Sequence, residues 1–292
     1  MVIYPDVGVM MNELLNTIKY IPHTIKNALI EIYYNQKLYA IWLTINLLLI
    51  AVTFLWINLT EGLPIDKLSK VWSLSGYLVF FWIACAAYFS MKMLQSRGFM
   101  LNITNTPTYV LTTVQIINFY ILFIISLIML LIIAISNKVE IDTSIVSIIY
   151  FSLMTFLLLM PICTLLSLMS HLFDNMRWII MVILFLILIS VPILWIPSDL
   201  PELLINILKL NPFYFIVNGV QESVVLGSTP LLNLPAQMIF IFELILIYIW
   251  FNYFYKILKD EININKSEGS EPKKQSKLSI NLQNLRDSIF KS

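Results

Sequence analysis

Charged residues are scarce in this sequence. Only 12% of its 292 residues are Asp, Glu, Lys or Arg, against roughly a quarter in soluble proteins. Hydrophobic residues make up 59%, and the mean hydropathy is +0.85. One soluble core cannot bury so much apolar surface, so we expect the bilayer to be the main solvent. The formal net charge of +1 gives no basic field, which excludes electrostatic binding of nucleic acid.

Sequence motifs for catalysis, metal binding and ATP binding are also missing. The two cysteines, Cys85 and Cys163, lie inside apolar runs, where a thiol behaves as a small hydrophobic group. His23 and His171 have no second ligand at zinc spacing. The seven glycines form neither a G-x-x-x-x-G-K loop nor a G-x-S-x-G elbow. We therefore predict a non-enzymatic chain that binds no metal or cofactor, and any ATP dependence must come from another subunit.

Long apolar runs dominate what is present. Each is close to the ~20 residues that an α-helix needs to cross a bilayer. We predict an all-α, polytopic membrane protein with about six transmembrane helices. The long fourth run is counted as one helix, kinked or tilted at Pro161. The predicted spans are residues 40–59, 72–91, 115–136, 144–170, 178–196 and 234–255.

The distribution of Lys and Arg predicts the orientation, because positively charged loops stay in the cytoplasm. An even number of spans places both termini on one side. Apart from the C-terminal tail, that side carries six basic residues and the other side four, so we predict cytoplasmic termini. The six are Lys19, Lys26, Lys37, Lys92, Arg97 and Arg177, and the four are Lys67, Lys70, Lys138 and Lys209.

The two terminal segments differ from the spans between them. We predict that residues 1–39 form a cytoplasmic amphipathic segment, broken at Pro22. It either lies in the cytoplasmic membrane–water interface or packs on protein. Residues 40–258 form the predicted six-helix transmembrane domain. Residues 259–292 turn polar through EININKSEGSEPKKQ and predict a flexible cytoplasmic tail. The apolar positions of the first segment are Met11, Leu14, Leu15, Ile18, Ile25, Leu29, Ile32 and Tyr33.

Two connections carry further features. The cytoplasmic one, from Lys92 to Thr113, predicts either a short helix with polar ends or a simple connector. The outer one, from Pro197 to Pro235, predicts two helices that are too short to span. We expect this pair to dip into the outer leaflet as re-entrant helices, and a pair of surface helices capping the bundle is the alternative.

Local signals place these two short outer helices. Ser198 or Asp199 is expected to cap the first helix, with Pro201 and Glu202 in its first turn. Asn211 and Pro212 interrupt the apolar pattern that follows. The second helix is expected within FYFIVNGVQESVVLG, residues 213–227.

Three polar residues stand inside predicted spans. Glu243 lies in the last run, and an intramembrane charge is costly and usually faces protein or water. It is either a polar lining or substrate contact, or a protonated or hydrogen-bonded packing residue. We expect the side chains of Asn46 and Asn118 to form hydrogen bonds between helices.

Two strings, FDNMRWIIMVILFLILISVPILWIP and LKLNPFYFIVNGVQESVV, carry a resemblance to a known family. They are similar to the permeases of type-2 ABC exporters, in the branch that exports teichoic acids and O-antigen polysaccharides. The match covers about a quarter of the chain, and the topology agrees across nearly all of it. The matching residues are Pro192, Ile193, Leu194, Trp195 and Pro197, then Asn211, Pro212, Tyr214 and Ile216.

The resemblance implies a homodimer in a bacterial cytoplasmic membrane, working with two copies of a separate ATPase that holds ATP and Mg. The complex would move a lipid-linked cell-envelope polysaccharide or teichoic acid. It implies an outer gate and substrate path at Asn211, Pro212, Phe213, Tyr214, Phe215 and Glu243. It also implies a coupling segment that contacts the ATPase through Arg97, Asn102, Asn105 and Pro107.

Three other functions stay open at this point. A type-2 ABC permease for a drug, lipid or peptide would use the same fold, because fold does not fix substrate. A membrane-embedded transferase acting on lipid-linked sugars is an enzyme alternative, although no cluster of acids, bases or metal ligands indicates one. A non-transporting membrane scaffold is the third.

Overall fold

The computed structural model describes residues 22–59, 63–104, 108–173, 175–195 and 201–268. Within these ranges nearly all regular structure is α-helical, apart from the 3-10 helix η2 (Thr229–Leu232) and one isolated bridge between Asp142 and Leu226. The predicted all-α class is confirmed: this is a polytopic α-helical membrane protein.

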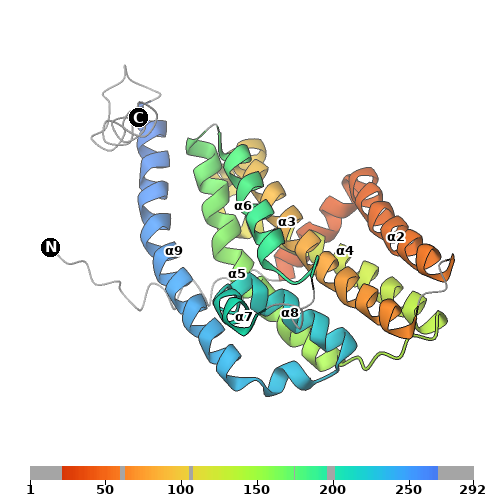
Figure 1. Ribbon diagram of the computed structural model, residues 1–292. Helices are drawn as coiled ribbons and strands as arrows, with labels where there is room; N and C mark the ends of the chain where they lie inside the picture. Colours follow the sequence, from red (N-terminus) through yellow and green to blue (C-terminus); the bar gives the residue numbers. More distant parts are fainter. Residues whose placement is uncertain (1–21, 60–62, 105–107, 174, 196–200, 269–292) are drawn as a thin grey trace.

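Five described helices are long and apolar enough to cross a membrane: α2 (Gln36–Leu59), α3 (Pro64–Thr104), α4 (Thr108–Ser136), α5 (Ile145–Leu172) and α9 (Leu234–Glu268). The chain reverses between successive helices, so α2 and α4 end where α3, α5 and α9 begin. We call this side of the bundle the Ser144 end and the opposite side the His171 end. Figure 1 shows α2 and α9 on opposite flanks, with α3, α4 and α5 between them.

The fifth predicted span, 178–196, is shorter than expected. It forms α6 (Met176–Ser190), whose 15 residues extend about 22 Å, less than the ~30 Å hydrocarbon core. The chain leaves the helix at Val191, since Pro192 lacks the N–H that would continue it. Met176 packs against Met91 near the end of the α3 span, so α6 runs from the His171 end toward the Ser144 end.

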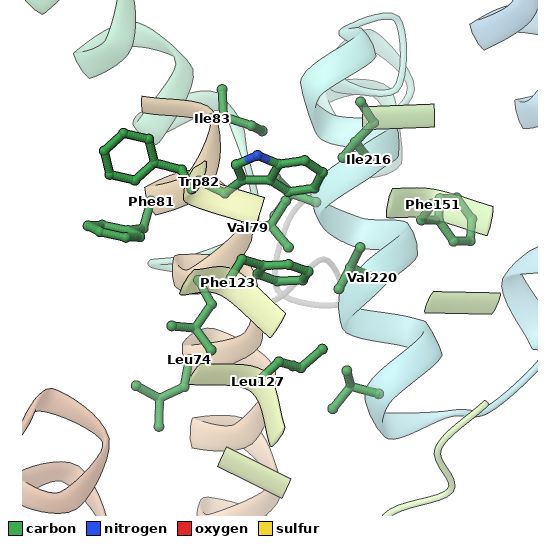
Figure 2. Packing of buried hydrophobic residues seen from close by; sticks show 14 of the residues in the cluster. Leu74, Val79, Phe81, Trp82, Ile83, Phe123, Leu127, Phe151, Ile216 and Val220 are labelled. Carbon is green, nitrogen blue, oxygen red and sulfur yellow. The ribbon is translucent and has the colours of Figure 1, made fainter. Parts of the chain in front are cut away.

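Aromatic packing between α3 and α4 forms the centre of the bundle. Trp82 stacks on Phe123 with ring centroids 5.4 Å apart and contacts Tyr120 at 4.9 Å. Its indole Nε1 donates to the carbonyl of Ile116 at 3.0 Å, which satisfies the one polar atom of a fully buried ring. Figure 2 shows Trp82 and Phe123 in this cluster. Pro161 lies inside α5, which continues past it as one helix, as predicted.

The predicted interhelical hydrogen bonds of Asn46 and Asn118 are confirmed. Both residues are fully buried. Asn46 accepts from the Tyr77 hydroxyl at 3.2 Å, and its amide is 3.5 Å from Ser126 Oγ. Asn118 donates to the Tyr39 hydroxyl at 2.8 Å. These bonds join α2 to both α3 and α4, although most of α2 is exposed.

Tyr39→Phe tests the α2–α4 bond. We expect a loss of about 0.6 to 1.7 kcal/mol in the free energy of unfolding, the range for hydrogen bonds between membrane helices, because the Asn118 amide loses this partner. Thermal unfolding in detergent measures it, with the half-buried Tyr120→Phe as the matched control. An equal effect of both variants would contradict the assignment.

A helix over residues 22–34 precedes α2 and turns into it at Asn35. Thr24 and Ala28 are buried, and the amide of Gln115 in α4 donates to the Glu31 carboxylate at 2.6 Å. The predicted apolar stripe lies on a different side of this helix from Ala28 and is exposed at Ile25, Leu29 and Tyr33. This helix therefore packs on protein through its small residues and keeps an apolar face free for the interface. Residues 1–21, including most of the predicted segment, lie outside the described ranges.

Two helices extend further than the sequence indicated. The predicted loop from Lys92 to Thr113 does not form a separate helix: α3 continues to Thr104 and α4 starts at Thr108, directly after Pro107. At the other terminus, α9 continues past the predicted boundary at Lys259 to Glu268. No Gly or Pro occurs between Pro235 and Gly269 to stop it. The rest of the predicted tail lies outside the described ranges.

Candidate functional site

The most unusual element is α8 (Pro212–Val225), a 14-residue helix placed among the spans. Its start follows local capping rules. The side chain of Asn211 accepts from the backbone N–H of Phe213 at 3.0 Å, and Pro212 occupies the first turn, where its missing N–H costs nothing. The prediction of two short helices between the fifth run and the last span is confirmed. The second begins at Pro212 rather than Phe213.

The first short helix, α7 (Glu202–Leu208), lies at the surface, with Leu203 and Ile207 exposed. Pro201, expected in its first turn, stands at the N-cap position and makes no side-chain cap. The expected caps Ser198 and Asp199 lie outside the described ranges. The two short helices therefore differ, because α7 is superficial whereas α8 is embedded.

α8 is buried between α3 and α5 rather than capping the bundle. Ile216, Val217 and Val224 are fully buried and Val220 is 1% exposed. Figure 2 shows Val220 on the side of α8 that faces Trp82 and Phe123, with Phe151 of α5 on its other side. A side chain at Gly219 would fall on the Phe151 ring, so only glycine permits this approach.

The C-terminal end of α8 is held by the connection between α4 and α5. The Ser144 N–H donates to the Ser223 carbonyl at 3.0 Å, and the Thr143 hydroxyl donates to the Val224 carbonyl at 2.9 Å. The Ser147 and Ser223 hydroxyls are 2.6 Å apart. The helix ends at Val225, and Gly227, two residues later, has a φ of 74° that suits glycine. These contacts place this end of α8 at the Ser144 end of the bundle.

The aromatic residues predicted for the gate lie at the other end of α8. Phe215 stacks on Phe240 of α9, with centroids 4.6 Å apart, and contacts Phe151 at 5.3 Å. Tyr214 is buried and stacks on Trp195 at 6.1 Å. The Asn211 amide donates to Ser190 Oγ, the last residue of α6, at 2.8 Å. The structure thus brings Asn211, Tyr214 and Phe215 into contact with α5, α9 and the end of α6.

One face of α8 is polar. Tyr214, Asn218 and Glu222 follow one another at four-residue spacing, and the Asn218 amide donates to the Glu222 carboxylate at 2.7 Å. Burial raises the pKa of Glu222 above its ordinary value, while the Asn218 hydrogen bond and the Lys209 charge oppose this. Burial, and secondarily the Glu222 charge, raises the pKa of Tyr214 to about 12.

The raised pKa of Glu222 predicts how stability depends on pH. The folded chain binds this proton more tightly than the unfolded chain, so ionisation costs stability as the pH rises above the ordinary value of 4.5. We expect Glu222→Gln to unfold at a higher temperature than the parent at pH 8, with the difference shrinking toward pH 4.5. Thermal melts in detergent at both values measure it, with the exposed Glu140→Gln as the control. A pH-independent difference would contradict the explanation.

Glu243, the other residue predicted for the path, lies on α9, about 14 Å along the helix from its start and so near mid-membrane. It is half-buried, and its buried Oε2 has no hydrogen-bond partner among the described residues. Phe240, one turn before Glu243 on α9, stacks on Phe215, so Glu243 lies close to the aromatic residues of α8. Both predicted roles, a lining residue and a packing residue, stay predictions.

The residues predicted to contact an ATPase are only partly described. Arg97 and Asn102 lie on the C-terminal part of α3, beyond the predicted span of residues 72–91. Asn105 and Pro107 fall outside the described ranges. The backbone therefore places this segment at the His171 end, opposite the C-terminal end of α8.

Sequence reasoning missed Gln221, a fully buried residue of α8 whose side chain points toward α3. Its Nε2 donates to the Pro192 carbonyl at 2.7 Å and to the Trp72 carbonyl at 3.1 Å. Gly76 of α3 makes room for it, since a Cβ there would fall on the Gln221 amide. The signal available in the sequence was a glutamine within the apolar stretch VNGVQESVV.

Among the described residues, no group of three or more His, Cys, Asp or Glu side chains is arranged to hold a metal ion. No protein-family model matches the sequence, and no curated protein matches it either. The fold and this site define a multi-pass α-helical membrane protein with one short helix inserted among its spans.

Proposed function

We propose that this chain is the transmembrane permease subunit of a type-2 ABC exporter. It moves a lipid-linked cell-envelope polysaccharide or teichoic acid across the bacterial cytoplasmic membrane. Two copies pair as a homodimer, and a separate ATPase subunit binds ATP and Mg. Both termini lie in the cytoplasm.

The observation that carries this proposal is the position of α8. An Asn-Pro-capped helix, too short to span, sits inside the bundle directly before the last span. Non-helical backbone at membrane depth is tolerated where it is buried in protein or lines a polar cavity. The segment from Val191 to Trp195 is of this kind, because Val191 and Ile193 are buried and Pro192 accepts a hydrogen bond. Such interrupted elements suit a path that must open and close.

Two features at the His171 end also support the proposal. The helix over residues 22–34 packs beside the start of α4 while leaving an apolar face exposed. The α3 helix extends beyond its span toward residues 105–107. An ATPase seated on this extension would act on α3 and α4, the two helices that carry the aromatic centre of the bundle. ATP-driven movement there would rock the bundle and open the Ser144 end.

On this proposal the residues of α8 take specific roles. Asn211 and Pro212 fix the start of the helix, and Phe213, Tyr214 and Phe215 form a gate on the substrate path, inside the bundle and away from the outer, Ser144 end. Aromatic faces contact sugars and lipid tails alike. Glu243 provides a polar contact on the path. At the other end, Arg97, Asn102, Asn105 and Pro107 contact the ATPase.

The proposal is tested by purifying the tagged chain in mild detergent and identifying co-purifying subunits by mass spectrometry. We expect a P-loop ATPase in equal amount, with ATPase activity that is lost when residues 102–107 are deleted. Deleting residues 270–275 of the polar tail is the control, and it should leave the ATPase bound.

The alternatives give different results in the same experiment. Stimulation of the complex by drugs, lipids or peptides, but not by lipid-linked glycopolymer, would identify the other kind of permease. Failure to recover an ATPase even after crosslinking in membranes would overturn the exporter proposal and favour the scaffold or the transferase.

A further inference from the structure

A short embedded helix must be fixed by its lateral contacts. α8 extends only about 21 Å, so the membrane does not anchor both its ends as it does those of a span. Most of its buried surface is apolar, through Ile216, Val217, Val220 and Val224. Apolar contact is non-directional, so it holds the helix in the bundle without fixing its position along its axis. Directional contacts must do that, and those described above, to Thr143, Ser144 and Ser190, hold only the two ends of α8.

Gln221 supplies directional contacts to two other parts of the chain at once. Its single amide nitrogen bonds to Pro192, 29 residues away, and to Trp72, 149 residues away. The Pro192 carbonyl lies just past the end of α6, where no further helical N–H is available to it. The Trp72 carbonyl belongs to α3 and also accepts from the Ser75 hydroxyl at 2.8 Å. Gln221 therefore ties α8 to both α3 and the segment that follows α6.

This attachment is incomplete, because the Gln221 amide nitrogen has hydrogen-bond partners and its buried oxygen, Oε1, has none among the described residues. A buried acceptor without a donor opposes the stabilisation from the two donated bonds. The attachment therefore stabilises the position of α8 by less than two bonds from a fully paired amide would.

We propose that Gln221 is a latch that holds α8 against α3 and the 191–195 segment, and that α8 moves away from α3 when its two hydrogen bonds break. Gly76 is the second part of the latch, because its missing side chain lets the amide reach the Trp72 carbonyl. The inference goes beyond the proposed function and does not depend on it, since it concerns a movement of this chain alone.

A buried reporter on α8 tests the latch. Val220 is 1% exposed and faces α3 and α4 (Figure 2), so Val220→Cys should react slowly with a charged maleimide. The native cysteines Cys85 and Cys163 are buried, and the parent chain gives their background. Adding Gln221→Leu should raise the labelling rate about tenfold or more, as expected when two hydrogen bonds are lost.

Two controls separate the latch from general loosening. Asn218→Ala removes an amide that donates to Glu222 within α8 itself, so labelling at Val220→Cys should not change. Ala134→Cys reports on a fully buried position of α4, and Gln221→Leu should leave its labelling rate unchanged. Equal increases at both reporters, or no increase at Val220→Cys, would overturn the latch.

Gly76→Ala provides an independent variant that keeps Gln221 itself intact. Its Cβ would displace the Gln221 amide, so labelling at Val220→Cys should rise as it does with Gln221→Leu. A rate equal to that of the parent would overturn the latch, even if Gln221→Leu fails to fold. Because the purified chain is labelled without an ATPase, this result is separate from the outcome of the co-purification.

Discussion

Gly219→Val is expected to destabilise the bundle by about 3 kcal/mol or more, at the upper end of overpacking effects. Its side chain would overlap the Phe151 ring, which is 1% exposed and contacts Tyr150 and Phe215. The ring is buried between α5, α8 and Phe215, so it or the backbones of α5 and α8 must shift. Thermal unfolding in detergent and the yield of monodisperse protein measure the loss.

Asn218→Val is the matched control, because it places the same β-branched side chain on the neighbouring, half-buried position of α8. Helix propensity favours valine over glycine, so a loss at Gly219 cannot come from propensity. In a double-mutant cycle, Gly219→Ala should cost less in a Phe151→Leu background than in the parent. Additive effects would show that the two residues do not constrain each other.

Glu243→Leu is expected to raise stability while lowering function. A charged residue near the middle of a span costs about 3 to 4 kcal/mol relative to leucine, and Glu243 Oε2 has no partner among the described residues to offset this. We therefore expect a higher thermal midpoint. If the costly residue is kept for the transport path, the ATPase activity of the complex should fall at least tenfold.

Glu243→Gln separates charge from hydrogen bonding, because it keeps size and polarity. Activity retained with glutamine would assign a hydrogen-bonding role, and activity lost with both variants would assign the charge. A lower thermal midpoint for Glu243→Leu would instead identify Glu243 as a packing residue. That result would remove it from the path without affecting the proposed roles of α8.

Hydropathy predicted the spans well because long apolar runs have few alternatives in a bilayer. α2 and α5 match their predicted runs to within four residues, and α4 and α9 each contain their predicted run but are longer. The span over residues 178–196 was predicted too long. Hydropathy averages over Pro192 and does not register that the helix must end before this residue. The extension of α3 to Thr104 was missed for the opposite reason: a polar sequence can remain helical when nothing interrupts it.

The candidate site was only half predictable. Asn211 and Pro212 carry a local capping signal, so the start of α8 could be predicted from neighbouring residues. Gln221, Gly76 and Phe151 are separated by long stretches of sequence and meet only in the folded bundle. A single sequence contains no local signal for such a meeting, because the pairing depends on how α8 lies against α3 and α5.

The shortness of α6 has a consequence for the lipid around the protein. Its outward face is apolar and exposed at Trp178, Phe185 and Leu186, but the helix covers only about 22 Å, roughly half the length of α4. Acyl chains beside α6 must shorten or tilt to match this low hydrophobic belt, while those beside α4 need not. The annulus is therefore uneven, with its thinnest sector next to the interrupted backbone after Val191. A lipid-anchored molecule approaching along the membrane would cross the least hydrocarbon at that sector.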